Sequence, residues 1–325
     1  MDSWTAGLSL EELKDIATQI RCDIIEMTTA AGSGHPGGSL SATDILTALY
    51  FGGIICHDPK NPNWPGRDRF VLSKGHVAPV LYAALARAGY FEVSELATLR
   101  KFGSRLQGHP DRLKLPGVEV SAGSLGQGLS VSSGLAYALR ADAAATGRQP
   151  NHVFTLLGDG ECQEGQVWEA AMFAGNQGLS NLVAIIDRNG LQIDGATAEI
   201  NDLRDLGQKF ECFGWRRFEV DGHDLSALMG LFTAILADPT DRPTCVIAHT
   251  VKGKGVSFME NQAAWHGVAP NAEQCAAALA ELRSPLGHPE EQAPGHPEGQ
   301  PLGRPEEQAP GHPEEQAPGQ QEGQR

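Results

Sequence analysis

Residues 153–169 read VFTLLGDGECQEGQVWE, and this stretch sets the expected fold. The apolar run at 153–157 predicts a buried strand, and residues 165–177 have the apolar spacing of a helix. The same alternation continues along the chain, with strands expected at 182–187, 216–220 and 245–249 and helices at 203–212 and 225–237. Such alternation predicts the α/β fold class, a parallel sheet with helices on both faces.

The N-terminal half gives weaker but compatible signals. Ser9 and Glu12 form a capping-box pattern that opens a helix, which runs into the glycine-rich loop GSGHPGG at 32–38. Residues 70–72 predict a short strand, and SAGSLGQG at 121–128 opens an alanine-rich helix. Ligands of open parallel sheets bind beyond the carboxyl ends of the strands, so the loops after the strands are where a site is expected.

Composition excludes several classes of function. The net charge is −15 without a basic stripe, which argues against nucleic acid as a partner. No basic, apolar leader opens the sequence and no apolar run approaches a membrane span, so we expect no membrane association. The six cysteines form no CxxC pair, which favours reduced thiols in a cytoplasmic protein.

The C-terminal residues differ from the rest in composition. From Gly287 the sequence repeats with a period of eight residues, as in GHPEEQAP, and holds almost no apolar side chains. Such a segment cannot bury enough apolar surface to offset the entropy of ordering it. We therefore predict a folded domain at 1–284 and a disordered low-complexity tail at 285–325.

Two polar residues end neighbouring strands of the expected sheet. Asp159 stands between two glycines after the first strand, and Asn189 follows the next strand. A right-handed crossover would bring both to one edge, where carboxylate and amide oxygens suit Mg²⁺. The cation would supply positive charge for a phosphorylated ligand in this acidic chain. A tight turn at GDG and an Asn-Gly turn are the competing interpretation, and these residues alone leave both open.

The spacing GDG-x(28)-N resembles the thiamine-diphosphate motif, and further motifs in the same order resemble transketolase. They are SGHPG (33–37), RDRFVLSKGH (67–76), LQGHP (106–110), SLGQG (124–128), GDGECQEGQVWEA (158–170), DRNGLQIDG (187–195), TVKGKG (250–255) and WHG (265–267). The likeness spans nearly all of residues 9–282. It implies the diphosphate-binding type of the thiamine-diphosphate-binding fold, with thiamine diphosphate and Mg²⁺ as cofactors.

The resemblance also implies roles for individual residues. Asp159, Asn189 and the main-chain carbonyl of Leu191 would be the Mg²⁺ ligands. The cofactor would be bound by His76, Gly123, Ser124, Leu125, Gly160, Asn189 and His266. Ser124 stands where the family commonly has proline, a change of small consequence for a backbone contact.

Four histidines in glycine-flanked loops are the candidate catalytic residues. The resemblance places His35, His76, His109 and His266 along the cofactor and substrate channel. Cleaving a ketose beside its carbonyl moves protons at hydroxyl and carbonyl oxygens, and imidazole donates or accepts protons near neutral pH. A structural hydrogen bond is the competing interpretation for any single histidine.

Several charged residues keep two interpretations. Glu164 and Glu169 either favour the dipole of their helix or lie at a subunit interface near the cofactor. Lys252 and Lys254 are either phosphate contacts or part of a hinge. Cys162 is expected to be a passive small residue.

The resemblance stops near residue 282, and full-length transketolases carry two further modules. The missing pyrimidine-binding module supplies the glutamate that activates the cofactor. We therefore expect an N-terminal subunit of a split transketolase, which forms an α₂β₂ assembly with a separate C-terminal subunit and acts on sugar phosphates. The alternatives are the matching subunit of a deoxyxylulose-phosphate synthase-like or specialised-sugar enzyme, and a non-catalytic regulatory subunit.

Overall fold

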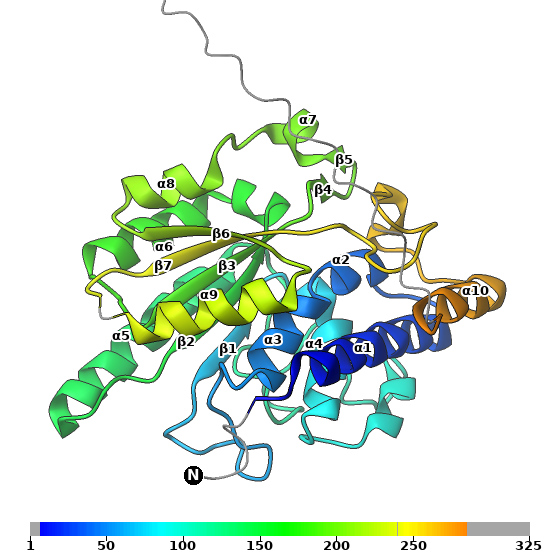
Figure 1. The fold of residues 1–325 in the computed structure, drawn as a ribbon, viewed down its shortest axis with the longest axis horizontal. Helices are drawn as coiled ribbons and strands as arrows, with labels where there is room; N and C mark the ends of the chain where they lie inside the picture. Colours follow the sequence, from blue (N-terminus) through cyan, green and yellow to red (C-terminus); the bar gives the residue numbers. More distant parts are fainter. Residues whose placement is uncertain (1–6, 239, 285–325) are drawn as a thin grey trace, which may run out of the picture. The chain divides into compact units, whose positions relative to one another are not determined.

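Five parallel strands form the central sheet of the protein, in the order β1-β2-β3-β7-β6 (Figure 1). This is a computed structural model, and it describes residues 7–238 and 240–284. The strands are β1 (Arg69–Leu72), β2 (Val153–Gly158), β3 (Leu182–Arg188), β6 (Arg216–Asp221) and β7 (Thr244–His249). Every expected strand is present, and the predicted α/β class with a parallel sheet is confirmed.

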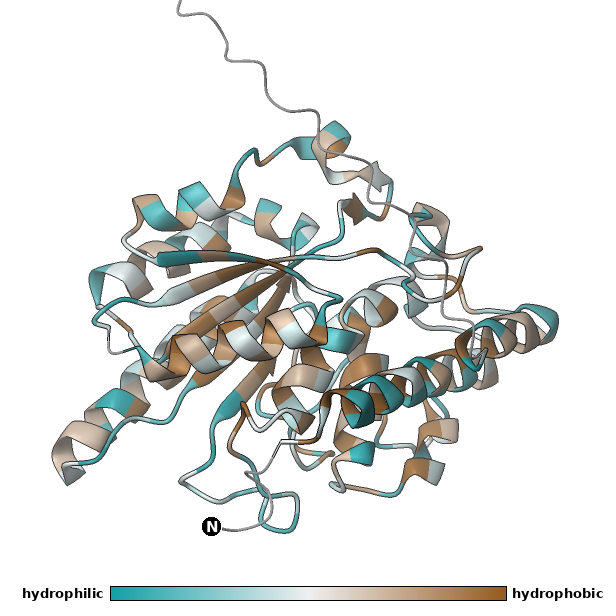
Figure 2. Cartoon of the chain, viewed as in Figure 1, coloured by the Kyte–Doolittle hydropathy of each residue, from teal (hydrophilic) through white to brown (hydrophobic). Residues whose placement is uncertain are grey.

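The central strands are mostly apolar because both of their faces are covered. In β2, Phe154 and Leu156 pack into one hydrophobic cluster, whereas Val153 and Leu157 pack into a second. Side chains alternate between the two faces of a strand, so the two clusters lie on opposite sides of the sheet. Figure 2 shows the resulting hydrophobic strands between the helical layers.

Helices cover both faces of the sheet. One cluster includes residues of α1 (Leu10–Ala31), α3 (Thr43–Phe51), α4 (Ala78–Arg87), α9 (Leu225–Ala237) and α10 (Ala272–Leu282). The other includes residues of α5 (Gln127–Thr146), α6 (Gly165–Asn176) and α8 (Leu206–Cys212). The capping box predicted at the start of α1 is present, with the Glu12 carboxylate accepting from the Ser9 amide at 2.8 Å.

Three local features differ from the sequence expectation. The loop expected at 32–38 is partly helical, because α2 (Pro36–Ser41) begins at a proline whose fixed φ suits a first helical position. Helix α8 begins at Leu206 rather than near 203, because Asp205 caps it by accepting from the Gln208 amide at 2.9 Å. The segment after β3 forms a hairpin of β4 (Leu191–Gln192) and β5 (Gly195–Ala196), followed by α7 (Thr197–Asn201).

The predicted tail at 285–325 lies outside the described residues, so its disorder and the domain boundary stay predictions. Within the described part, no helix is long and apolar enough to cross a membrane. All six cysteines lie in that part and are free thiols, as their spacing predicted.

Candidate active site

The carboxyl ends of β2 and β3 bring Asp159 and Asn189 to one edge of the sheet. The two strands pair directly in parallel, with Gly158 opposite Asp187. Both carboxylate oxygens of Asp159 accept backbone hydrogen bonds, from the Gly160 amide at 2.9 Å and the Gly190 amide at 2.8 Å. The second bond ties the tip of β2 to the turn after β3, so the predicted meeting of the two strand ends is confirmed.

A cavity of about 450 Å³ opens at this edge. It is lined by all but one of the predicted site residues, namely His35, His76, His109, Gly123, Leu125, Asp159, Gly160, Asn189, Leu191 and His266. The exception is Ser124, which is exposed and lines a neighbouring cavity of about 110 Å³ together with Gly123.

Three of the four histidines form a cluster on one side of the cavity. The ring centroids of His35 and His76 are 5.1 Å apart, and those of His76 and His266 are also 5.1 Å apart. His35 precedes α2, whereas the other two lie in short 3₁₀ helices, Gly75–Val77 and Ala263–His266. The buried Nδ1 of His35 has no hydrogen-bond partner among the described residues. An unpaired buried nitrogen of this kind fits a site that receives a polar ligand.

Burial keeps these imidazoles neutral at neutral pH. Desolvation, with added repulsion from nearby cationic side chains, lowers the pKa of His35 and of His266 to about 4. The same causes lower the pKa of His76 further, and burial lowers that of His109. A neutral imidazole carries one donor and one acceptor, which suits proton exchange with hydroxyl and carbonyl oxygens.

Lys252 points into the cavity, and Lys254 does not. Lys252 is 2% exposed, and its ammonium donates to the Leu191 carbonyl at 3.3 Å and lies 2.9 Å from His266 Nδ1. Burial, with repulsion from Lys74, lowers the pKa of Lys252 to about 8. The Lys254 ammonium lies 3.8 Å from the Glu260 carboxylate. The position of Lys252 favours the phosphate-contact interpretation for it.

A buried acidic residue, Asp187, lies near the carboxyl end of β3 and binds side chains from three other segments. Asp187 forms an ion pair with Lys74 and accepts from the hydroxyls of Ser41 and Thr250. Burial opposes ionisation of Asp187, but Lys74 together with the Ser41 and Thr250 hydroxyls outweighs it and holds the pKa of the carboxyl below its usual range. The sequence analysis did not single out this network, although Lys74 and Asp187 lie within the quoted SKGH and DRNG motifs.

Glu161, which lines the cavity, connects three separate segments of the chain. Its carboxylate accepts from Ser73 Oγ at 2.5 Å, from the Gly126 amide at 2.9 Å and from the Gly158 amide at 3.0 Å. Burial raises the pKa of Glu161 and also that of Asp159, where the neighbouring Asp187 adds to the effect. Two buried acids with raised pKa values at one edge favour the presence of a compensating cation.

The oxygens at this edge fit a hard divalent cation. The predicted donors are the Asp159 carboxylate, the Asn189 amide oxygen and the Leu191 carbonyl, all oxygen ligands of the kind Mg²⁺ prefers. The Lys252 ammonium already contacts the Leu191 carbonyl, which shows that this oxygen is accessible to a cation in the cavity. A cluster of three His, Cys, Asp or Glu side chains suited to a metal is absent from residues 7–238 and 240–284, and the predicted set contains only one such side chain.

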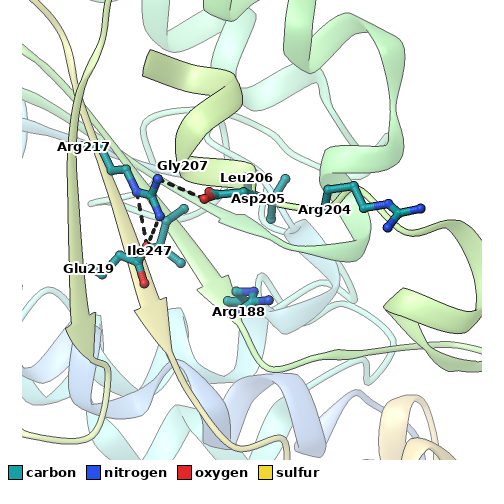
Figure 3. A pocket seen from close by; sticks show the side chains of 8 residues that line it. All are labelled: Arg188, Arg204, Asp205, Leu206, Gly207, Arg217, Glu219 and Ile247. Carbon is teal, nitrogen blue, oxygen red and sulfur yellow. Dashed lines mark hydrogen bonds and ion pairs between the residues drawn. The ribbon is translucent and has the colours of Figure 1, made fainter. Parts of the chain in front are cut away.

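A second cleft, of about 280 Å³, lies between α8 and strands β3, β6 and β7 (Figure 3). Its central arginine, Arg217, is paired with Asp205 at 3.0 Å and with Glu219. The cleft contains none of the predicted site residues. Both of its acidic residues pair with Arg217, whereas Arg188 and Arg204 contact His249 and Asp202, which do not line it. The histidine-lined cavity is therefore the candidate active site.

Comparison with known proteins identifies the family. The profile described as "Transketolase, thiamine diphosphate binding domain" matches residues 13–293. The chain belongs to the transketolase family. The match covers most of the chain and all the cavity residues named above, and it supports thiamine diphosphate as the cofactor of this transketolase domain.

Two relatives of similar length are single subunits by name. The chain is 44% identical over 271 residues to a 6-deoxy-6-sulfo-D-fructose transketolase subunit from a Clostridium species, covering 83% of this chain and 96% of that protein. It is 43% identical over 277 residues to an apulose-4-phosphate transketolase subunit from Phocaeicola vulgatus, covering 85% of this chain and 95% of the relative. The resemblance to N-terminal subunits of split transketolases, predicted from the motifs, is confirmed.

Longer transketolases match over part of their length only. Human transketolase is 45% identical over 262 residues, which are 79% of this chain and 40% of the human protein. The solved transketolase of Campylobacter jejuni superposes with a TM-score of 0.79 at 30% identity, over 85% of this chain and 43% of that one. The thiamine-diphosphate-binding fold type predicted from the sequence is confirmed by this likeness.

Arg100 is a residue of the site region that the sequence analysis missed. It is exposed, adopts a positive φ of 58° and lies with its guanidinium against Gly108, beside His109. Its charge contributes to the lowered pKa values of His35 and His109. No motif in the sequence marked it, because a single arginine in a polar loop has no distinguishing pattern.

Proposed function

We propose that this chain is the N-terminal subunit of a two-chain transketolase, which reversibly transfers a two-carbon ketol unit from a ketose phosphate to an aldose phosphate. The observation that carries the proposal is the cavity itself. It joins four histidines to the oxygen donors at the ends of two adjacent parallel strands. A non-catalytic subunit would have no need for so complete a set of site residues.

In this proposal the strand ends bind the cofactor through its diphosphate and Mg²⁺. Asp159, Asn189 and the Leu191 carbonyl would hold the cation, and Gly160 and the Lys252 ammonium would contact the diphosphate. Gly123 and Leu125, which line the cavity, and the neighbouring Ser124 would lie beside the rest of the cofactor. When bound, the thiazolium ring of thiamine diphosphate stabilises the carbanion left by cleavage of the carbon–carbon bond.

The histidines orient the sugar and move protons. His35, His76, His109 and His266 face the cavity, and as neutral imidazoles they can accept a proton from a sugar hydroxyl and return it to a carbonyl oxygen. A diphosphate bound beside His76 and His266 would raise their pKa values toward neutrality, because an anion favours the protonated ring. We further propose that Arg100, whose charge acts on His35 and His109, contacts the phosphate of a substrate.

The chain works with a separate C-terminal subunit that carries the pyrimidine-binding and C-terminal modules. Support comes from length, since the chain spans about 40% of human transketolase but nearly the whole of two proteins named as subunits. We propose an α₂β₂ assembly that is inactive without its partner and located in the cytoplasm. Glu164, which lines the cavity, and Glu169 of α6 are both exposed, so a partner could cover them.

The names of the relatives favour one alternative within the same chemistry. Two of them act, by name, on a sulfonated fructose and on apulose 4-phosphate, so a transketolase for a specialised sugar is the second candidate. A deoxyxylulose-phosphate synthase-like activity differs in using pyruvate as the donor.

Product analysis separates these candidates. The purified chain is mixed with its C-terminal partner, thiamine diphosphate and Mg²⁺, and is supplied with xylulose 5-phosphate and ribose 5-phosphate. Parallel reactions contain other ketose donors, or pyruvate with glyceraldehyde 3-phosphate. We expect two-carbon transfer from a ketose donor, and none by this chain alone. Robust turnover without the partner would contradict the split-enzyme proposal, and activity with pyruvate only would favour the synthase-like alternative.

A further inference from the structure

A buried polar network outside the cavity joins four separate parts of the chain. Asp44 of α3 is 4% exposed, and its Oδ2 accepts from Arg21 Nη2 of α1 at 2.5 Å. The same oxygen lies 2.8 Å from Nδ1 of His223, in the connection between β6 and α9. None of these three residues lines the cavity, and the sequence analysis assigned none of them a role.

The hydrogen bonds determine the tautomer of His223. Its Nε2 lies 2.8 Å from the backbone nitrogen of Val251, and a backbone N–H is always a donor. The Nε2 must therefore accept, and the proton of the neutral ring is on Nδ1. That proton is donated to Asp44. The imidazole therefore connects the buried carboxylate to the Val251 amide, with only one possible direction for each hydrogen bond.

His223 and Arg21 bind the two ends of one short segment, residues 251–254. His223 accepts from the Val251 amide, whereas Arg21 Nε donates to the Lys254 carbonyl at 3.3 Å. Between them, the Gly253 amide donates to the Gly37 carbonyl at 2.9 Å. Gly253 has a φ of +82°, and a Cβ there would lie 2.4 Å from the Met259 carbonyl oxygen, so only glycine fits this turn.

Lys252 is the residue that this segment presents to the cavity. Its side chain is long and flexible, and holding its ammonium at the Leu191 carbonyl costs conformational entropy. A backbone fixed on both sides of Lys252 reduces that cost. A buried ion pair such as Arg21–Asp44 often adds little to stability. A recognised use of such pairs is to favour one conformation over its alternatives.

We propose that Asp44 is a positioning residue for the active site. Through His223 and Arg21 it fixes the backbone at 251–254, and this places the Lys252 ammonium beside the Leu191 carbonyl. The positioning depends only on this chain's own residues, and its consequence for catalysis rests on the proposed function.

Two variants of His223 in the full chain test the positioning. His223→Leu replaces the imidazole with an apolar side chain of similar bulk and removes both hydrogen bonds. His223→Gln instead offers one donor and one acceptor with similar spacing. Hydrogen exchange by mass spectrometry follows the amides of residues 250–256, with β2 as the internal reference. A lost hydrogen bond of typical strength corresponds to about tenfold faster exchange. We expect that increase in the Leu variant and near wild-type exchange in the Gln variant.

A second readout follows Lys252 itself, with Lys254 as the control on the same segment. An amine-reactive reagent at pH 8 should label Lys252 faster in His223→Leu than in wild type, and His223→Gln should restore the slow rate. Labelling of Lys254, which is already partly exposed, should change little. Equal rates for Lys252 in all three proteins, or equal behaviour of the Leu and Gln variants, would overturn the proposal.

The unmodified protein provides a test that does not depend on folding of a variant. Nitrogen NMR of labelled histidine should show His223 protonated on Nδ1, with Nε2 as an acceptor. A proton on Nε2 would overturn the proposal. Both outcomes are independent of whether the assembled enzyme transfers ketol units, so failure of this inference and failure of the proposed function are distinguishable.

Discussion

Removing the Lys252 side chain should weaken cofactor binding without disrupting the fold. Its ammonium is buried in the cavity, whereas Lys254, two residues on, pairs with Glu260 outside it. In the complex with the partner subunit, Lys252→Met should weaken thiamine diphosphate binding about 10- to 100-fold, the range expected for one charge-assisted hydrogen bond. Calorimetric titration measures this affinity.

Lys254→Met is the matched control, since it removes the same charge from the same segment. Its affinity should stay within about twofold of wild type. An equal loss in both variants would show that net charge, rather than a contact at the diphosphate, is responsible.

The sequence predicted the chemically conspicuous residues and missed those that support them. Asp159 and Asn189 could be found because strand endings have a clear pattern and parallel strands end at one edge. Arg100, Glu161 and Asp44 could not be found this way. Their roles depend on contacts between segments far apart in the chain, such as Glu161 with the Gly126 amide.

Among the structural elements, α1 and α3 are joined by a buried ion pair between Arg21 and Asp44 as well as by apolar packing. Burial of Asp44 opposes its ionisation, but Arg21 and His223 outweigh this and hold the pKa of Asp44 below its usual value. The unfolded chain then binds more protons than the folded chain as the pH falls, so the pair's contribution is present above about pH 4 and is lost below it.

Asp44→Asn should therefore lower the free energy of unfolding at pH 7 by about 3–5 kcal/mol, the range for breaking a buried pair. The difference from wild type should shrink as the pH falls through the lowered pKa of Asp44. Urea unfolding at several pH values measures both quantities. Parallel pH dependence of the two proteins down to pH 3 would show that Asp44 does not carry the acid sensitivity.

Element types were predicted well, but some boundaries and the small hairpin were not. The strands at 153–157 and 182–187 have strong apolar runs, so their existence followed from the pattern alone. The start of α8 was set by the Asp205 cap rather than by periodicity. The hairpin of β4 and β5 contains only two residues per strand, too few for any alternation to show in the sequence.

For the molecule as a whole, the family assignment and the fold agree on a transketolase thiamine-diphosphate-binding domain. The cavity contains the residues proposed to hold the cation and the four proposed catalytic histidines, and the chain spans 40% of human transketolase. Assembly with a C-terminal subunit is therefore the central requirement of the proposed function. Product analysis will assign the substrates of the assembly, since the named relatives act on different sugars.

The most direct test is a crystal structure of the assembly with thiamine diphosphate and Mn²⁺, which reports the position of the divalent cation through its anomalous signal. We predict one strong peak per cavity, within about 2.3 Å of the Asp159 carboxylate, the Asn189 amide oxygen and the Leu191 carbonyl. The same peak should be lost in Asp159→Ala and retained in Asp194→Ala, which removes an exposed carboxylate from the same cavity. A cofactor bound with no peak at the ends of β2 and β3, or a peak that survives in Asp159→Ala, would contradict the account.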